Sequence, residues 1–334
     1  MPVLNEVEYV RAAVESILAQ DYDGPVEVVL ALGPSSDGTA EVVAALQAAD
    51  ARIRVVENPG MDIPLGLNLA IAASRHPIIV RVDAHTELSE GYTARGVAVL
   101  EETGAASVGG IMVAVGRPGF QAAVARAYNS PLGLGGGAYH GERATAGPAE
   151  SAYLGIMRAD ALAAVGGYDP SLRRGEDWEL NFRLRQAGGT VWLDPALRVS
   201  YWPRSTWPRL ARQFLATGIW RGELVRRLGA RNPARFFAPP VLVVDLVLCV
   251  LLAPLLAAGI LPAVAAWILA LAYLGPIAYL VLLLVAAIGS TGSFADRARF
   301  ALVLATMHLC WGAGFLAGLV RGARDAVDTS RTES

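Results

Sequence analysis

The feature that most constrains this chain is a long apolar stretch without charge. From Leu246 to Ala295 the sequence contains no Asp, Glu, Arg, Lys or His. A bilayer-spanning helix needs ~20 apolar residues, so this stretch has room for two spans. We expect them to separate near Gly259-Ile-Leu-Pro262, and the second to kink at Gly275-Pro276. The run from Phe300 to Val320 predicts a third span, so this part of the chain is expected to lie in a membrane.

The composition before this region is different. Up to about Asn232 the chain has the pattern of a soluble α/β protein, and the excess within the 54% hydrophobic content of the whole sequence lies after that point. The formal charge of −2 gives no sign of a nucleic-acid partner. The only cysteines, Cys249 and Cys310, both lie in the apolar third, which excludes a disulfide framework and a cysteine-based metal site.

Strand and helix patterns alternate through the first half. Near-continuous apolar runs such as Val26 to Leu32 are typical of strands buried on both faces. The expected elements begin with a helix from Glu6 to Gln20, the strand from Val26 to Leu32 and a helix that ends at about Ala49. A strand from Ile53 to Val56, a helix from Gly66 to Ser74 and a strand from Ile78 to Val82 follow. Later strands are expected within Gly104 to Val115 and within Ser151 to Arg158, and a helix from Ala159 to Val165 comes after them. This alternation predicts a Rossmann-like parallel sheet covered by helices.

The sequence pattern lacks a complete first strand for this sheet. A parallel sheet of this kind should begin with a strand before Glu6, but only four residues precede Asn5. Either the first strand is very short or the true start lies upstream. We favour an upstream start.

A strand with polar residues at its end lies in the middle of this half. In Pro77-Ile-Ile-Val-Arg-Val-Asp83-Ala-His85 a β-branched run leads to an acidic residue and an imidazole two positions apart. Alternate residues of a strand point to one side, so Asp83 and His85 are expected to converge on a cation or a phosphate-bearing ligand. The plainer reading is an Asp that caps a turn and a His that lines it.

The turn Ser35-Ser-Asp-Gly-Thr39 joins a strand to a helix and puts hydroxyls, a carboxylate and exposed amides at a helix start. Such a start favours anions, although Asp37 or Thr39 can also be an ordinary helix cap. The chain has no GxGxxG and no Walker pattern, which argues against a dinucleotide dehydrogenase and a P-loop enzyme.

A second polar cluster is Gly175-Glu176-Asp177-Trp178-Glu179. Three carboxylates in four residues at a helix start would be stabilised by the helix dipole alone. The alternative is chemical: clustered carboxylates beside a shielded pocket can raise one another's proton affinity, so Asp177 is a candidate general base for a hydroxyl nucleophile. Upstream of this cluster, the Gly-rich segment from Leu132 to Pro148, which contains His140, is expected to form a mobile loop over the site.

The segment from Thr206 to Leu228 mixes aromatic and apolar residues with five arginines, a composition typical of a helix at a membrane surface. Basic residues continue up to the first span, which predicts a cytoplasmic location for the preceding domain. The expected organisation is an α/β domain over residues 1–204, an amphipathic interfacial segment over 205–236, a transmembrane region of about three helices over 237–321 and a polar tail over 322–334.

Taken in order, these motifs resemble those of the family 2 inverting glycosyltransferases of the GT-A fold, in the membrane-associated branch typified by succinoglycan-type exopolysaccharide transferases. The resemblance covers roughly Pro2 to Glu223. It rests on Pro2-Val-Leu-Asn5-Glu6 at the nucleotide pocket, on Ser35-Ser-Asp-Gly-Thr39, on Val82-Asp-Ala-His85 as the metal and diphosphate motif, and on Glu176-Asp177 with Glu179-Leu180 and Arg183 as the catalytic-base motif and its helix.

The resemblance implies roles for these residues. Asp83 with His85 would hold a divalent cation, Mn²⁺ or Mg²⁺, against the diphosphate of a nucleotide-sugar donor, and an imidazole ligand favours Mn²⁺. Asp177, with Glu176 beside it, would deprotonate the acceptor hydroxyl. The donor is expected to contact Pro2, Asn5, Glu6, Ser35, Asp37 and Asp83, and the acceptor Trp178, Gln213 and Trp220.

Two departures from the family pattern bear on specificity. The Asp usual at the end of the second strand is replaced within Ala31-Leu32-Gly33-Pro34, which leaves the nucleotide open, with a UDP-sugar favoured. The Gln-x-x-Arg-Trp signature of processive synthases is absent, which favours addition of a single sugar.

The expected function is that of a metal-dependent, membrane-anchored hexosyltransferase that moves one sugar to a lipid-linked or membrane-proximal acceptor. A related alternative is a transferase that charges polyprenyl phosphate itself. An alternative of another class is a non-catalytic membrane scaffold that retains the fold.

Overall fold

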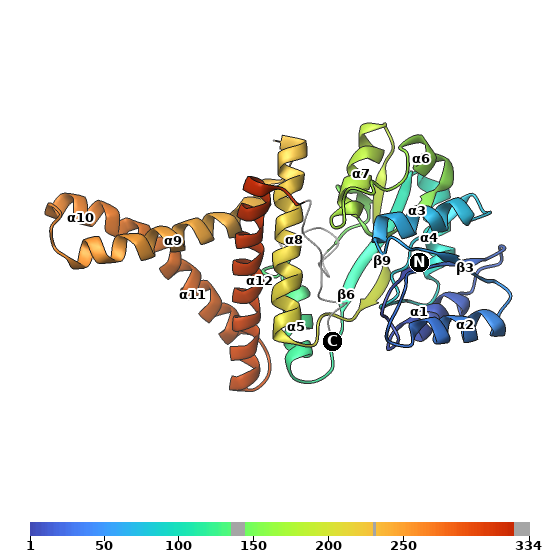
Figure 1. Cartoon of the computed structure of the whole chain (residues 1–334), viewed down its shortest axis with the longest axis horizontal. Helices are drawn as coiled ribbons and strands as arrows, with labels where there is room; N and C mark the ends of the chain where they lie inside the picture. The colour runs from blue at the N-terminus through green and yellow to red at the C-terminus, as the bar shows by residue number, and fades with distance from the viewer. Residues whose placement is uncertain (135–143, 230–231, 324–334) are drawn as a thin grey trace. The chain divides into compact units, whose positions relative to one another are not determined.

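The computed structural model describes residues 1–134, 144–229 and 232–323, and the chain divides into two compact units (Figure 1). Unit 1 comprises Met1–Val115 and Asn129–Pro203, and unit 2 comprises Gly116–Tyr128 and the chain from Arg204 onward. Unit 1 differs from the expected domain over residues 1–204 mainly in the segment Gly116–Tyr128, which belongs to unit 2 because it packs on the last helix of that unit.

Unit 1 contains short strands and helices in alternation through its first half. In chain order its elements are β1 (Pro2–Val3), α1 (Val10–Leu18), β2 (Val28–Leu32), α2 (Thr39–Ala49), β3 (Ile53–Glu57), α3 (Ile63–Ala73), β4 (Ile78–Val80), β5 (Thr86–Leu88), α4 (Tyr92–Thr103), β6 (Ser107–Ala114), β7 (Gly147–Pro148), β8 (Tyr153–Arg158), α6 (Ala159–Ala164), α7 (Glu176–Gln186) and β9 (Val191–Tyr201). Every strand and helix expected in this half is present, with ends shifted by a few residues.

The strands form two sheets. β1, β2 and β3 make a parallel sheet, while the second sheet has the order β4-β8-β6-β9-β5 with β7 on β9, and its pairs are antiparallel except β6 with β9. The prediction of a wholly parallel sheet is therefore wrong beyond β3. It extrapolated the strand–helix alternation, whereas β5 follows β4 through a short turn and pairs with the long strand β9, which the pattern did not reveal.

The first strand is very short. β1 consists of Pro2–Val3, and Pro2 pairs with Ala31 of β2. The expectation of an upstream start stays a prediction.

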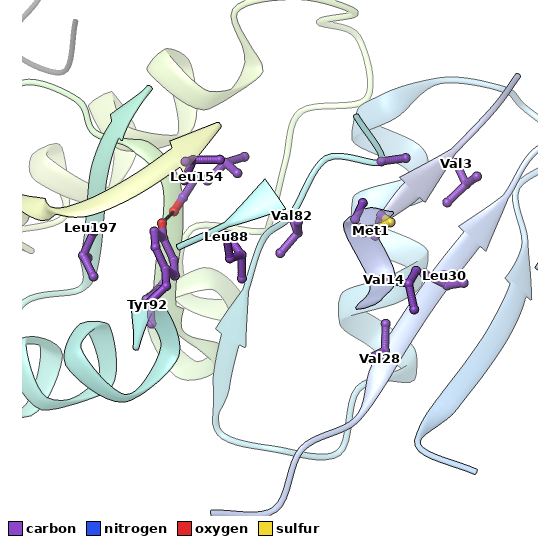
Figure 2. Close-up of a cluster of buried hydrophobic side chains, with 14 of the residues drawn as sticks. Met1, Val3, Val14, Val28, Leu30, Val82, Leu88, Tyr92, Leu154 and Leu197 are labelled. Carbon is purple, nitrogen blue, oxygen red and sulfur yellow. Dashed lines mark hydrogen bonds between the residues drawn. The ribbon is translucent and has the colours of Figure 1, made fainter. Parts of the chain in front are cut away.

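The main core of unit 1 lies between the first helices and both sheets (Figure 2). Val3, Val14, Val28 and Leu30 come from β1, α1 and β2, and they join Tyr92 and its neighbours in one apolar cluster. Tyr92 is fully buried, and its hydroxyl donates to the backbone oxygen of Leu154 at 2.8 Å (Figure 2). This bond satisfies a polar group that would otherwise be costly to bury.

Unit 2 is helical. Its elements are α5 (Phe120–Tyr128), α8 (Trp207–Leu228), η3 (Ala234–Phe237), α9 (Ala238–Ala257), α10 (Ala263–Ala270), η4 (Leu271–Tyr273), α11 (Leu274–Gly289) and α12 (Phe294–Arg321). Three helical stretches, Ala234–Ala257, Ala263–Gly289 and Phe294–Arg321, are long and apolar enough to cross a membrane. The first two are separated at the expected Gly259 to Pro262, and the second is interrupted by η4 just before Gly275.

Helices α8 and α12 pack backbone to backbone (Figure 1). A side-chain carbon at Gly218 or Gly222 of α8 would collide with backbone atoms of α12, and one at Gly314 or Gly318 of α12 would collide with backbone atoms of α8. Pairs of glycines four residues apart let helices approach this closely. The amphipathic segment expected at a membrane surface is thus also the packing partner of the last helix.

Candidate active site

The candidate site of unit 1 is organised around one buried arginine. Arg81 follows β4 directly, and its side chain is only 3% exposed. Its guanidinium forms ion pairs with Asp83 at 3.1 Å, with Glu176 at 3.1 Å and with Asp177. The Tyr168 ring lies 5.6 Å from the guanidinium carbon. One cation therefore joins two acidic motifs that are almost a hundred residues apart in the sequence.

The electrostatics of this cluster keep the arginine charged. Burial alone would lower the pKa of Arg81, but the neighbouring Asp83 and Glu176 raise it overall. Burial also raises the pKa of the Tyr168 hydroxyl to about 12. A cation in a buried place needs such partners because desolvation of an unpaired charge is very costly.

The three carboxylates differ in access to solvent. The side chain of Glu176 is 9% exposed, that of Asp83 is 18% exposed and that of Asp177 is 34% exposed. Asp177 is thus the carboxylate that a bound molecule reaches most readily. A general base must be within reach of the hydroxyl whose proton it takes, and this exposure meets that requirement.

Local structure places the acidic motif at the start of α7. Gly175, with a φ of 75°, takes the left-handed conformation that precedes the helix, and Glu176, Asp177 and Glu179 occupy the first turn. Carboxylates there are favoured by the helix dipole. Arg183, one turn later, binds Glu179 at 2.6 Å, so Glu179 supports the helix and is not part of the Arg81 cluster.

The predicted convergence of Asp83 and His85 does not follow from the strand, because β4 ends at Val80 and both residues lie in the turn after it. Asp83 binds Arg81, whereas Nδ1 of His85 lies 3.4 Å from a carboxylate oxygen of Glu6. The His85 ring is buried and meets the Tyr201 ring edge to face. The alternation of side chains along a strand therefore does not predict where the side chains of Asp83 and His85 point.

The predicted metal site requires Asp83 and His85 to face a common cation. Among the described residues, no group of three His, Cys, Asp or Glu side chains is gathered in a way that could hold a metal ion. Asp83 is paired with Arg81, and His85 lies against Glu6. The side chains that the structure describes therefore do not form a metal site by themselves.

The two predicted donor motifs are bound to each other. The Asn5 side chain accepts a hydrogen bond from the Ser36 amide at 2.9 Å, and the Ser35 hydroxyl accepts one from the Asn5 amide at 3.1 Å. Asp37 accepts from the amides of Thr39 and Val7. Asp37 therefore holds the turn and the amino-terminal segment together. The residue at the N-cap of α2 is Gly38, without a side-chain cap bond, so the plainer reading of Asp37 or Thr39 as the helix cap is wrong.

The predicted acceptor residues fall in both units. In unit 1, Trp178 is buried, its indole N–H donates to Glu150 at 2.7 Å, and its ring stacks on Phe182. In unit 2, Gln213 and Trp220 are buried in α8, where Gln213 accepts a hydrogen bond from the Tyr128 hydroxyl at 3.3 Å. All three are packed residues, and their contact with an acceptor stays a prediction.

The predicted loop from Leu132 to Pro148 lies largely outside the described residues, which omit 135–143. Its end forms β7 on β9. A cavity of about 280 Å³ in unit 1, between β2 and β4, reaches Arg81 and Tyr168. The rest of its lining is mostly apolar, with polar side chains from Gln20, Glu27, Ser74, His76 and Thr93. The three carboxylates are not among its lining residues.

Sequence reasoning missed Arg81, Tyr168 and Glu150. A signal for Arg81 was present: a single arginine inside the apolar run Ile78 to Val82 must find buried acidic partners if that run is a core strand. No comparable signal marks Tyr168 or Glu150, since their roles depend on contacts between segments far apart in the sequence.

Residues 1–163 match the family described as Glycosyl transferase family 2. The chain is 34% identical over 317 residues to the succinoglycan biosynthesis protein ExoA of Rhizobium meliloti (strain 1021), which covers 94% of this chain and 92% of that protein.

Two further comparisons are more distant. A dolichyl N-acetyl-alpha-D-glucosaminyl phosphate 3-beta-D-2,3-diacetamido-2,3-dideoxy-beta-D-glucuronosyltransferase of Methanococcus voltae is 22% identical over 237 residues, 68% of this chain and 73% of that protein. The crystal structure of S. aureus TarS 1-349 in complex with UDP matches 71% of this chain and 67% of that chain, with a TM-score of 0.47 and 16% identity.

The extent of the match to ExoA covers both the α/β unit and the apolar helices. The predicted fold class, an α/β domain of the GT-A type followed by apolar helices that could span a membrane, is confirmed. The chain belongs to glycosyl transferase family 2.

Proposed function

We propose that this glycosyltransferase moves a single sugar from a nucleotide-sugar donor to a lipid-linked saccharide at the membrane surface, with inversion at the anomeric carbon. The observation that carries the proposal is the gathering of Asp83, Glu176 and Asp177 around Arg81, with Asp177 the most exposed of the three. The names of the relatives, a succinoglycan biosynthesis protein and a transferase acting on a dolichyl-linked sugar phosphate, support a lipid-linked acceptor.

In the proposed reaction, the acceptor hydroxyl oxygen attacks the anomeric carbon while its proton passes to Asp177. The new glycosidic bond forms as the bond between that carbon and the diphosphate oxygen breaks, and the nucleoside diphosphate leaves. Asp177 suits this step because it is exposed enough to meet the acceptor. Glu176 is almost enclosed and pairs with Arg81, so its role is to hold that cation in place.

The donor is proposed to lie over the joined motifs that begin at Pro2 and Ser35. Their hydrogen bonds fix the backbone of Asn5, Glu6 and the Ser35 turn, which gives a nucleotide a rigid surface. A UDP-sugar is the donor that we propose first. Asp37 contributes to this donor surface indirectly, because it accepts hydrogen bonds from the backbone amides of Val7 and Thr39.

The requirement for a divalent cation, Mn²⁺ or Mg²⁺, stays part of the proposal. Such an ion would neutralise charge on the departing diphosphate. Because the described side chains do not form a complete site, we propose that a cation binds together with the donor and that Asp83 is the side chain that contacts it.

Membrane attachment is proposed to hold the enzyme at the surface where its acceptor lies, with unit 1 in the cytoplasm. The three long apolar helices support membrane association. The basic residues of α8 before the first apolar helix support the cytoplasmic side, since positive charge collects there.

The test is release of nucleoside diphosphate by full-length enzyme in detergent with native lipid extract. A panel of nucleotide sugars would be assayed with Mn²⁺, with Mg²⁺ and with chelator, for the wild type and for Asp177→Asn. We expect turnover with one donor, lost by a factor of roughly 10² to 10⁴ in Asp177→Asn, as is usual for removal of a general base. Full activity of Asp177→Asn would refute the base assignment, and full activity in chelator would refute the cation requirement.

A further inference from the structure

Both ends of α12 contact helices that carry charge. Near its start, the guanidinium of Arg126 in α5 donates to the backbone oxygen of Thr291 at 2.8 Å and lies 6.0 Å from the ring of Phe300. Near its end, a side chain at Gly322 would stand 2.6 Å from the Arg226 guanidinium and 3.2 Å from the Glu223 carboxylate of α8. A helix of 28 residues, about 42 Å at 1.5 Å per residue, is thus attached at both ends to segments that precede the apolar region.

The middle of α12 is tied to α8 as well. Leu215 of α8 meets Gly314, and Ile219 meets Gly318, so the two helices run side by side in the same direction. Figure 1 shows them adjacent along much of their length. Whatever depth α12 takes in a membrane, α8 must share it.

The charges of α8 argue against that depth being the bilayer core. α8 carries Arg209, Arg212, Arg221, Glu223, Arg226 and Arg227. Insertion of a charged residue at the centre of a spanning helix costs roughly 2.5–3.5 kcal/mol even on the mildest scale. A pair of helices that includes α8 would therefore strongly favour the interface, where charged groups remain in water and apolar faces are covered.

The other two apolar stretches are less enclosed. The first contacts α8 at its start, where the Arg221 guanidinium carbon lies 4.0 Å from the centre of the Phe236 ring, and a side-chain carbon at Gly312 of α12 would meet the backbone oxygen of Pro239. Ala234–Ala257 and Ala263–Gly289 are more apolar than α12, and the buried share of their apolar segments is 17% and 0%, against 39% for α12. Figure 1 shows α9 running across the direction of α12. Two crossings return the chain to the side from which it left, which explains how Thr291 can meet Arg126 of α5.

We propose that the chain crosses the membrane twice, through α9 and then through α10, η4 and α11, and that α12 lies beside α8 in the headgroup plane. The surface formed by α8 and α12 would then contact the lipid headgroups of the same bilayer, and the five arginines of α8 against one glutamate suit anionic lipids. The inference rests on the proposed membrane anchoring. It replaces the expected third span and puts the residues after Arg321 on the side of unit 1.

The experiment maps sidedness in sealed vesicles of known orientation. In a background with Cys249→Ala and Cys310→Ala, full-length protein would carry a single cysteine as Glu101→Cys in unit 1, Ile260→Cys between α9 and α10, or Thr332→Cys in the tail. Glu101 and Ile260 are both exposed. An impermeant maleimide should label Glu101→Cys and Thr332→Cys from one side and Ile260→Cys from the other.

The outcomes separate the topology from the anchoring. Labelling of Thr332→Cys together with Ile260→Cys, opposite to Glu101→Cys, would overturn the two-crossing topology. Release of the protein by alkaline carbonate would instead refute the anchoring. Because a cysteine-free variant can fail to fold, a second measurement uses the otherwise unchanged chain with an epitope tag after Ser334. Protease added from the side of unit 1 should remove the tag. Protection of the tag from that protease would equally overturn the proposal.

Discussion

The guanidinium of Arg81 is ion-paired with the carboxylate of Asp177, across 96 positions of sequence. The same guanidinium holds Glu176 of α7 and Asp83 of the turn after β4, each at 3.1 Å. Arg81 thus fixes the start of α7, where the proposed base lies, against the turn that contains the proposed diphosphate contact. It acts through these carboxylates, so it is a positioning residue.

Replacement of Arg81 by methionine should cost both stability and activity. Met keeps much of the volume but leaves three carboxylates beside one another without their cation, for which we expect a loss of about 3 kcal/mol of unfolding free energy. The measurement is thermal unfolding in detergent together with donor turnover. A matched control is Arg158→Met, since the side chain of Arg158 donates hydrogen bonds to the backbone oxygens of Ala105 and Leu100 and lies outside the Arg81 cluster. This variant should leave turnover per folded molecule unchanged. Equal behaviour of the two variants would contradict the role of Arg81.

Glu176→Gln should reduce turnover less than Asp177→Asn. Glu176 is enclosed and supports Arg81, while Asp177 is the exposed carboxylate. We expect a loss on the order of tenfold for Glu176→Gln, equivalent to about 1.4 kcal/mol, with the larger loss confined to Asp177→Asn. The readout is the rate of nucleoside diphosphate release at saturating donor. The reverse order would assign the base to Glu176.

The sequence was sufficient to predict elements whose signal is local. The strands β2, β3 and β4 and the helices α2 and α3 follow from apolar runs and turn residues, and the apolar helices follow from length and lack of charge. Local patterns could not reveal β9, because Asp194 and Pro195 interrupt its apolar run and its place in the sheet depends on β5 and β6. The division into one parallel and one mixed sheet is likewise a property of pairing between distant strands.

The site was predictable in its residue types and not in its contacts. Asp83, Glu176 and Asp177 were identified as acidic motifs, but their common partner Arg81 and the pairing of His85 with Glu6 arise only when the chain is folded. In unit 2, glycines four apart in α8 and α12 were a readable signal for close packing. We expected α8 only to lie at a membrane surface, and its pairing with α12 was therefore missed.

Stability should depend on Asp37 in mildly acidic and neutral solution. Burial tends to raise the pKa of this carboxyl, but hydrogen bonds from Thr39 and Val7 lower it overall. A lowered pKa means that the stabilisation is present above the unfolded value and is lost as the pH falls through the folded pKa. Asp37→Asn should therefore be less stable than the wild type at pH 7, by about 1 kcal/mol for an exposed carboxylate that accepts several hydrogen bonds, and the gap should narrow as the pH falls below roughly 4. Urea unfolding at both pH values measures it. A gap that is the same at both would show that the charge of Asp37 is not involved.

The contact of α8 with α12 should be sensitive to a single methyl group. In Gly218→Ala the new carbon would meet the backbone oxygen of Trp311, which cannot move without displacing α12, whereas ordinary helix propensity would make alanine the better residue. Overpacking of this kind costs about 1–3 kcal/mol, so we expect Gly218→Ala to lower the thermal midpoint in detergent. Gly289→Ala at the end of α11 is the matched control, since no atom lies within 4 Å of the added carbon, and it should be neutral or slightly stabilising. If both variants melt like the wild type, α8 and α12 are not in backbone contact. The charges of α8 would then not determine the depth of α12 in the membrane.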